Sequence, residues 1–152
     1  MAADGEAWRQ ERREAFEAHA QAQRRAEEAE SERARPLVAD FVRRAREQGL
    51  EPVPLRARAY SGTATYRTAV RGWYLQPSGP LAIGDDGAFY TLLAAPGLGA
   101  RLRGVDVVPS PPPLAVGRGA RDGESMPLAE LLDRRLAAGR AFRRVGGRER
   151  RS

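Results

Sequence analysis

The stretch that decides the fold is GWYLQPSGPLAIGDDGAFYTL, residues 72–92. Two turn signals, PSG at 77–79 and DDG at 85–87, separate three short apolar runs. Turns of this composition join neighbouring antiparallel strands. The stretch therefore predicts a three-stranded meander, and its apolar residues fall on both faces of that meander.

The two turns predict a register for the meander. A three-residue loop at PSG pairs Gly72 with Gly84. A two-residue type I′ loop at Asp86-Gly87, with positive φ at both positions, pairs Gly84 with Phe89. One face of the sheet then collects six apolar residues that we expect to form the core, namely Trp73, Leu75, Leu81, Ile83, Tyr90 and Leu92.

The other face of this predicted meander is a trough of small residues flanked by two aromatic rings. Its members are Gly72, Tyr74, Gly84 and Phe89. A glycine opposite an aromatic residue is a structural device, because the ring covers the bare backbone. Alternatively, the trough admits a ligand, a peptide strand or a nucleobase.

Upstream of Gly72 the alternation of apolar and polar residues breaks down. Strict alternation would place Arg67 and Arg71 on the face of Trp73, and arginines are rarely buried without partners. A β-bulge or sharp bend at Gly72 would remove this conflict. Regular pairing through Gly72 would refute the bulge. Short, strongly bent strands also predict a small curled sheet or a partly open barrel.

The segments around the meander predict an α+β fold. Residues 6–34 are strong helix formers but polar on all sides, so we expect a helical arm that is either solvated or held by a partner. A new amphipathic helix is predicted to start at Pro36, and another to follow Ser125 as its N-cap. Residues 55–60, 65–75 and 100–108 read as further strands.

We therefore expect three parts in this chain of 152 residues. Residues 1–35 form the long charged helical arm. Residues 36–139 form the core domain, with a short helix, a strongly bent antiparallel meander of about five strands and a C-terminal helix packed with it. Residues 140–152 form a disordered basic tail, because they hold six arginines and one acid.

Composition excludes several kinds of chemistry. The chain has no cysteine, which excludes disulfides and thiolate chemistry, and it has a single histidine, His19, with no partner for a metal site. We expect no cofactor, no metal and no enzymatic activity. No signal peptide or membrane span is predicted, which favours a cytoplasmic location. All 26 basic residues are arginine, which a high-GC genome produces by codon bias, so arginine usage alone is poor evidence for phosphate recognition.

One loop suggests an anion site. The loop GRGARDGES places Arg118 and Arg121 before Ser125, where a helix is predicted to begin. Helix N-termini attract anions through free N–H groups. The alternative is a flexible loop in which Ser125 is only a cap.

Two classes of function remain. The first is a protein-interaction or accessory role, in which the N-terminal helix docks on a protein partner or the PSPPP segment at 109–113 serves as a polyproline ligand. The second is nucleic-acid association, in which strands bearing arginine and tyrosine and the basic tail contact phosphates and bases. The candidate residues for the second class are Arg56, Arg58, Tyr66, Arg67, Arg71, Arg143 and Arg144.

Overall fold

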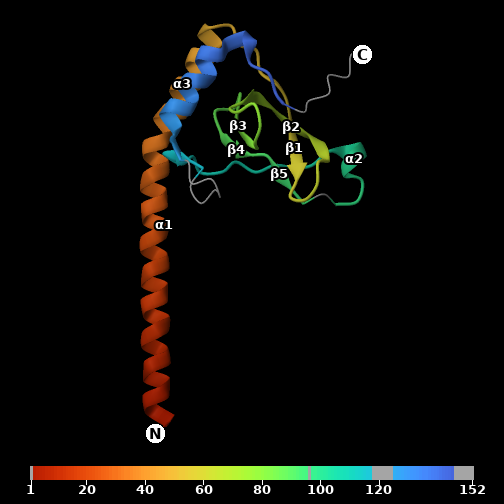
Figure 1. The fold of residues 1–152 in the computed structure, drawn as a ribbon. Helices are drawn as coiled ribbons and strands as arrows, with labels where there is room; N and C mark the ends of the chain where they lie inside the picture. The colour runs from red at the N-terminus through yellow and green to blue at the C-terminus, as the bar shows by residue number, and fades with distance from the viewer. Residues whose placement is uncertain (1, 96, 118–124, 146–152) are drawn as a thin grey trace.

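A computed structural model describes residues 2–95, 97–117 and 125–145 of the chain. It has the expected α+β architecture, with a long N-terminal helix, a five-stranded sheet and a C-terminal helix beside the first one (Figure 1). The elements in chain order are α1 (Ala2–Glu47), β1 (Val53–Ala59), β2 (Thr65–Tyr74), β3 (Leu81–Gly84), β4 (Phe89–Thr91), β5 (Leu93–Ala94), α2 (Ala100–Arg103), β6 (Ala115–Val116), β7 (Met126–Pro127), α3 (Leu128–Ala138) and the 3-10 turn η1 (Gly139–Ala141).

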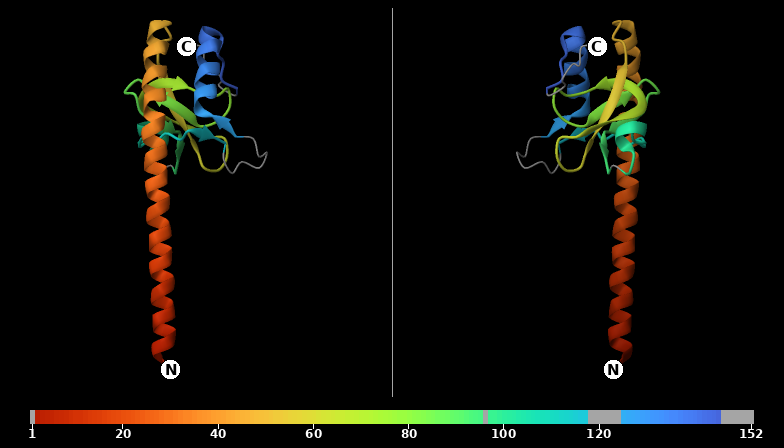
Figure 2. Two further views of the ribbon diagram at one scale, coloured as in Figure 1. Left: turned by 90° about the vertical axis from the view of Figure 1, so that its left-hand side faces the viewer. Right: turned by 90° about the vertical axis from the view of Figure 1, so that its right-hand side faces the viewer.

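Helix α1 runs without interruption through Pro36, so the prediction of a separate helix starting there is wrong. A proline inside a helix costs about 3 kcal/mol because it removes one hydrogen bond and crowds the preceding turn. Packing on both sides of Pro36 offsets this cost, since α1 buries Ser31, Ala34, Val38, Phe41 and Ala45. Upstream of this buried stripe the helix projects away from the rest of the chain (Figures 1 and 2).

The sheet curls until its two ends meet. Its strand order is β4-β3-β2-β1-β5, with β1 and β5 parallel and the other pairs antiparallel. Leu92, which joins β4 to β5, donates its N–H to Pro80 O at 2.7 Å, and its carbonyl accepts from Arg58 N at 2.9 Å. The chain therefore passes from the β3 side to the β1 side at this residue and closes a small barrel. The sheet is therefore mixed and not the purely antiparallel meander that was expected, because β5 pairs with β1 in parallel.

The first hairpin has the predicted register, and the second is shifted by one residue. Gly72 pairs with Gly84 as expected, but Ile83 rather than Gly84 pairs with Phe89. Gly87 alone has positive φ in this turn, and its N–H donates to Gly84 O at 2.9 Å. The loop is therefore a type I turn followed by a left-handed glycine, which adds one residue. Asp86 supports it by accepting from Ala88 N at 3.0 Å.

The one-residue shift exchanges Phe89 and Tyr90 between the two faces and explains why both faces are apolar. An outer cluster lies between the barrel and the helices; its buried residues are Ala34, Val38, Phe41, Ala45, Leu50, Trp73, Leu75, Ile83, Phe89, Val116, Leu128, Leu131, Leu132 and Leu136. An inner cluster fills the barrel and consists of Leu55, Ala57, Ala82, Tyr90, Leu92 and Ala94. The expected core face is thus divided, since Tyr90 and Leu92 belong to the inner cluster.

The predicted bulge at Gly72 is also wrong. Pairing is regular there, with Arg71 opposite Pro54 and Gly72 opposite both Val53 and Gly84. The irregularity lies nearer the start of β2, between the pairs at Arg71 and Arg67. Thr68 fills it, because its hydroxyl donates to Leu55 O at 2.8 Å.

Residues 100–108 do not form the expected strand, because 100–103 fold as the short helix α2 between glycines 99 and 104, both at positive φ. Ser125 does not cap a helix either. Helix α3 starts three residues later, at Leu128, whose N–H donates to Leu114 O at 2.7 Å. Met126 instead pairs with Val116 in the small β6–β7 ladder.

The described part of the C-terminal segment packs against the β2–β3 loop, unlike the disordered tail expected from residue 140. Arg144 donates to Gln76 O at 2.8 Å and to Gly79 O at 2.9 Å. Arg135 of α3 is 9 % exposed, donates to Tyr74 O at 2.7 Å and stacks on Phe142. Burial lowers the pKa of Arg135 to about 10, so this guanidinium keeps its charge at neutral pH. Residues 146–152 of the expected tail lie outside the described residues.

Candidate nucleic-acid interface

Three arginines project from the outer surface of β1 and β2. Along β1, Leu55, Ala57 and Ala59 are buried, so Arg56 and Arg58 point outward. Arg67 lies directly opposite Arg56 on β2. Like charges in direct cross-strand register destabilise a sheet. Folding stability therefore does not explain why Arg56 and Arg67 face each other across the two strands.

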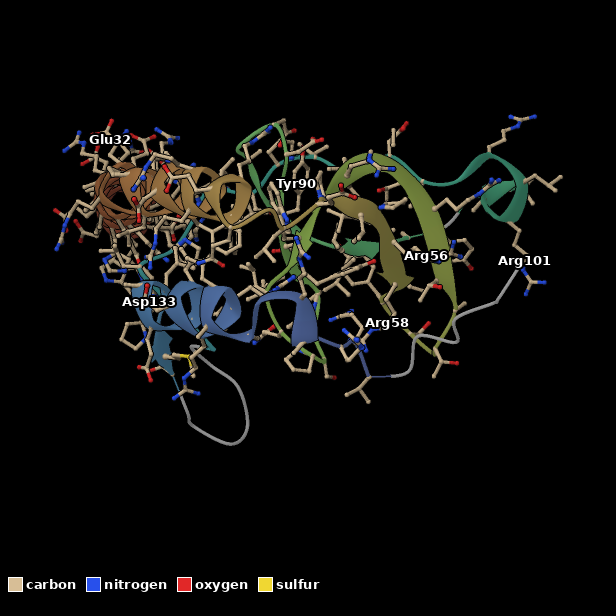
Figure 3. All side chains as sticks on the ribbon, turned by 90° about the horizontal axis from the view of Figure 1, so that it is seen from above. Glu32, Arg56, Arg58, Tyr90, Arg101 and Asp133 are labelled. Carbon is tan, nitrogen blue, oxygen red and sulfur yellow. The ribbon has the colours of Figure 1, made fainter. Side chains whose placement is uncertain are left out.

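The strands' arginines have no acidic counterpart in the part of the chain that the structure describes. The ion pairs found there all belong to the helices, as with Arg44 of α1 and Asp133 of α3 at 3.2 Å. Figure 3 shows Arg56, Arg58 and Arg101 on the side of the molecule remote from the helices that carry Glu32 and Asp133. The arginines on this side of the barrel are therefore not neutralised by an ion pair with an acid of the described residues.

Neutral acceptors hold two of these guanidinium groups in place. Arg56 donates through Nε to Thr65 Oγ1 and through Nη2 to Thr65 O, both at 3.1 Å. Arg67 donates through Nη2 to Leu102 O at 2.7 Å. A carbonyl or hydroxyl orients a guanidinium without removing its charge. Both groups retain further N–H donors for an anion.

Helix α2 adds a fourth arginine to this surface. Arg101 lines, together with Arg56, Thr65 and Arg67, a hollow of about 280 Å³. We call this the arginine hollow, and we call Arg56, Arg58, Arg67 and Arg101 the arginine surface. The sequence reasoning did not select Arg101, because residues 100–108 were expected to form a strand. The glycines at 99 and 104, which bound α2, are the signal that could have revealed the helix.

Arg144 lies close to the arginine surface. Its guanidinium stacks on the ring of Tyr74 at 4.2 Å. Burial lowers the pKa of Arg144, and the positive charge of Arg58 lowers it further. The C-terminal segment thus adds to the same positive potential.

Among the other candidate residues for nucleic-acid contact, Tyr66 also lines the arginine hollow, where it lies opposite Ala57 and is half-buried. The remaining two lie elsewhere. Arg71 is exposed, but its Nη2 donates to Pro52 O at 3.0 Å near the start of β1. Arg143 donates to the carbonyls of Arg140 and Phe142 within its own segment.

A second hollow lies at the free edge of β5. This β5 groove has a volume of about 740 Å³ and is open to solvent. Leu93, Val105 and Val107 contribute apolar side chains to its lining, which also includes Arg103, Asp106 and Tyr60. The side chain of Tyr60 is 73 % exposed. Sequence reasoning did not select this groove, because it depends on how the segment after β5 returns along the barrel.

The predicted trough does not exist as one surface. Phe89 belongs to the outer cluster, whereas Tyr74 packs against the inner cluster. The backbone of β3 closes the space at Gly72, where an added Cβ would lie 2.1 Å from Ile83 O. At Gly84 the added Cβ would lie 2.9 Å from the ring of Tyr90. An aromatic ring does cover a bare glycine here, but the ring is that of Tyr90.

The predicted anion site is only partly described. Arg118 and Arg121 lie outside the described residues. Ser125 is exposed and precedes β7, so it is not at the N-terminus of α3. The PSPPP segment lies against the barrel, with Pro112 buried and Ser110 N donating to Phe89 O at 2.8 Å.

Comparisons of the chain with protein-family models, with curated proteins and with solved structures found no match. Within the described residues, no three His, Cys, Asp or Glu side chains come together as metal ligands. No helix in that part of the chain is both long and apolar enough to span a bilayer. The arginine surface therefore has to be interpreted from its own chemistry.

Proposed function

We propose that this protein is a non-enzymatic nucleic-acid-binding protein of the cytoplasm, and that the arginine surface contacts the phosphate backbone. One observation carries the proposal. Arg56 and Arg67 face each other across two strands beside Arg101, and no carboxylate of the described residues pairs with them. A polyanion would supply the missing negative charge.

The geometry of the guanidinium groups supports phosphate as the ligand chemistry. Arginine presents planar pairs of N–H donors that match the oxygens of a phosphate. Because Thr65 and the carbonyl of Leu102 already orient Arg56 and Arg67, binding costs less side-chain entropy than it would for free side chains. Each neutralised phosphate releases counterions, so the affinity should fall steeply with salt.

The test is a salt titration of nucleic-acid binding by the double variant Arg56→Gln/Arg67→Gln. Glutamine keeps a side-chain N–H that can reach Thr65 but removes the charge. We expect the variant to lose at least about tenfold in affinity at low salt. We also expect the slope of log affinity against log salt to become shallower by about 0.7–0.9 for each lost phosphate contact.

The matched control is Arg9→Gln/Arg24→Gln, which makes the same change of net charge on the exposed part of α1. If the control loses as much affinity as the barrel variant, binding reflects net charge and not the arginine surface. Absence of binding to any nucleic acid at low salt would refute the proposal.

A second candidate function is protein interaction through α1. Residues 3–29 are almost entirely exposed and include Trp8 and Phe16, which are 56 % and 75 % exposed. At about 1.5 Å per residue this segment reaches roughly 40 Å beyond the packed part of the chain. A helix of this kind offers a long surface to a partner protein. A pull-down with the full chain and with a chain lacking residues 2–29 tests this role. A set of captured proteins that is the same for both baits would argue against it.

A further inference from the structure

The arginine hollow and the β5 groove lie on either side of the same two structural features. The first is α2, which contributes Arg101 to the arginine hollow and Arg103 to the β5 groove. The second is the turn between β1 and β2, which contributes Ala64 to the hollow and Tyr60 to the groove. One ligand that follows the surface past the turn could therefore occupy both.

The β1–β2 turn is tight, which brings the two hollows close together. Ala59 N donates to Ala64 O at 3.1 Å, so the ends of the turn are joined by a hydrogen bond. Tyr60 and Thr65 are the next residues along the chain from these two ends. The turn therefore carries a residue of each hollow, because Tyr60 lines the β5 groove and Ala64 lines the arginine hollow.

The two hollows differ in chemistry. The arginine hollow offers three cationic side chains, whereas the lining of the β5 groove combines apolar side chains such as Leu93, Val105 and Val107 with one arginine and one acid, Arg103 and Asp106. Tyr60 is exceptional among the exposed aromatic residues of the described chain, because Trp8 and Phe16 lie on the projecting helix and Tyr60 alone lies on the barrel. A phosphate suits the first hollow, and a flat, partly apolar base suits the second.

We infer that the ligand of this surface is a single-stranded nucleic acid, with a phosphate in the arginine hollow and a base on Tyr60 at the β5 groove. The inference rests on the proposed nucleic-acid function and specifies its substrate. In a duplex the bases are stacked inside and their faces cannot reach Tyr60. An unpaired strand turns its bases outward, where aromatic rings and arginines can contact them.

The experiment compares labelled single-stranded DNA and RNA of about 10 nucleotides, a length in the range that small barrels cover, with a duplex of the same sequence. Fluorescence anisotropy measures the affinity of the full chain and of the variants Tyr60→Ala and Tyr60→Phe. Because Tyr60 is exposed, neither substitution disturbs the core. Separate DNA and RNA strands show whether the ribose hydroxyl contributes, and tighter binding of either strand than of duplex supports the inference.

We expect the full chain to prefer the single strand. Tyr60→Ala should weaken single-strand binding by about five- to a hundredfold, which corresponds to the loss of one base-stacking contact. It should leave the salt dependence unchanged, because no phosphate contact is lost. Tyr60→Phe should retain most of the affinity, since it keeps the ring.

The possible failures are distinguishable. Equal binding of duplex and single strand, or unchanged binding by Tyr60→Ala, would overturn this inference and leave the arginine surface as a general phosphate-binding surface. Loss of affinity in Arg56→Gln/Arg67→Gln would still support the proposed function in that case. If the full chain binds neither strand nor duplex, both the proposed function and this inference are refuted.

Discussion

The outer surface of the barrel has an exposed part and a part covered by helices, and strand β2 with its continuation contributes residues to both. The odd-numbered residues of β2 and its continuation point outward. Arg67 and Arg71 come first and are exposed, whereas Trp73 and Leu75 follow and are buried beneath α1 and α3. The strand does not change faces between them. The comparison teaches that alternation tells which side of a sheet a residue faces, and that the covering elements decide whether that side is buried.

The helix-covered part is where the stability of this surface is concentrated. Trp73 is 1 % exposed, and its indole N–H donates to Leu50 O at 3.0 Å. Its ring meets Phe41 of α1 edge to face, with centroids 5.9 Å apart. The uncovered part has the opposite character, because Arg56 and Arg67 repel each other across the strands. We interpret this difference as a division of roles, in which the helix-covered part stabilises the fold and the uncovered part binds the ligand.

The strongest test of this division is Trp73→Ala. Removing the ring leaves a cavity between the barrel and α1 and strips Leu50 O of its donor, so we expect the free energy of unfolding to fall by about 3–5 kcal/mol. Urea denaturation followed by circular dichroism measures it. The matched control is Trp8→Ala on the projecting helix, which should change stability by no more than about 0.5 kcal/mol. A small effect of Trp73→Ala would mean that the helices do not hold the barrel.

A smaller effect is expected from Tyr90→Phe in the barrel interior, which lies behind both parts of the surface. The Tyr90 hydroxyl donates to Asp86 Oδ2 at 2.7 Å, and losing this bond should cost about 1.5 kcal/mol at neutral pH. Burial, with Asp86 adding to it, raises the pKa of Tyr90 from 10.0 to about 12.

The raised pKa fixes the direction of the pH dependence. The folded state holds the Tyr90 proton more tightly than the unfolded state does, so this stabilisation is complete below pH 10. It is lost as the pH rises from 10 to about 12. The stability difference between the wild type and Tyr90→Phe, measured by urea titration at several pH values, should therefore shrink over this range. A constant difference would show that the hydroxyl is not protected inside the barrel.

The smallest effect, and one of opposite sign, is expected from Arg58→Thr on the uncovered part. The substitution removes a positive charge near Arg144 and places a β-branched residue opposite Thr65. We expect a gain in stability of about 0.2–1 kcal/mol together with weaker nucleic-acid binding. Thermal unfolding and a binding titration on the same sample measure both. A variant that is less stable would show that Arg58 contributes to folding.

The registers of the two hairpins show how much of the strand pairing can be predicted from local sequence. The register at PSG was predicted correctly, because the glycine at position 79 adopts the positive φ that such a loop requires. The DDG register was wrong because the same three letters fit two loop lengths. Asp86 avoids positive φ and bonds to Ala88 N and to the Tyr90 hydroxyl. Tyr90 reaches Asp86 only in the longer loop, a preference that turn statistics do not contain.

The candidate interface was predictable in part. The sequence analysis selected Arg56, Arg58 and Arg67 as candidates, and the structure places the first two outward on β1 with Arg67 opposite Arg56 on β2. Arg101 and the β5 groove beside Tyr60 could not be predicted, because α2 and the groove form only when the chain after β5 returns along the barrel. Their association joins segments about 40 residues apart, and no local pattern encodes it.

By itself, the sequence determined the α+β class, the helical character of most of residues 2–47, the two-turn meander and the excess of arginine over acid. These properties depend on interactions between residues a few positions apart. Only the tertiary structure decided that α1 continues through Pro36, that Phe89 and Tyr90 occupy opposite faces, and that Leu92 closes the sheet into a barrel. The reason is that each outcome depends on burial against distant segments, whose free energy outweighs a local preference of a few kcal/mol.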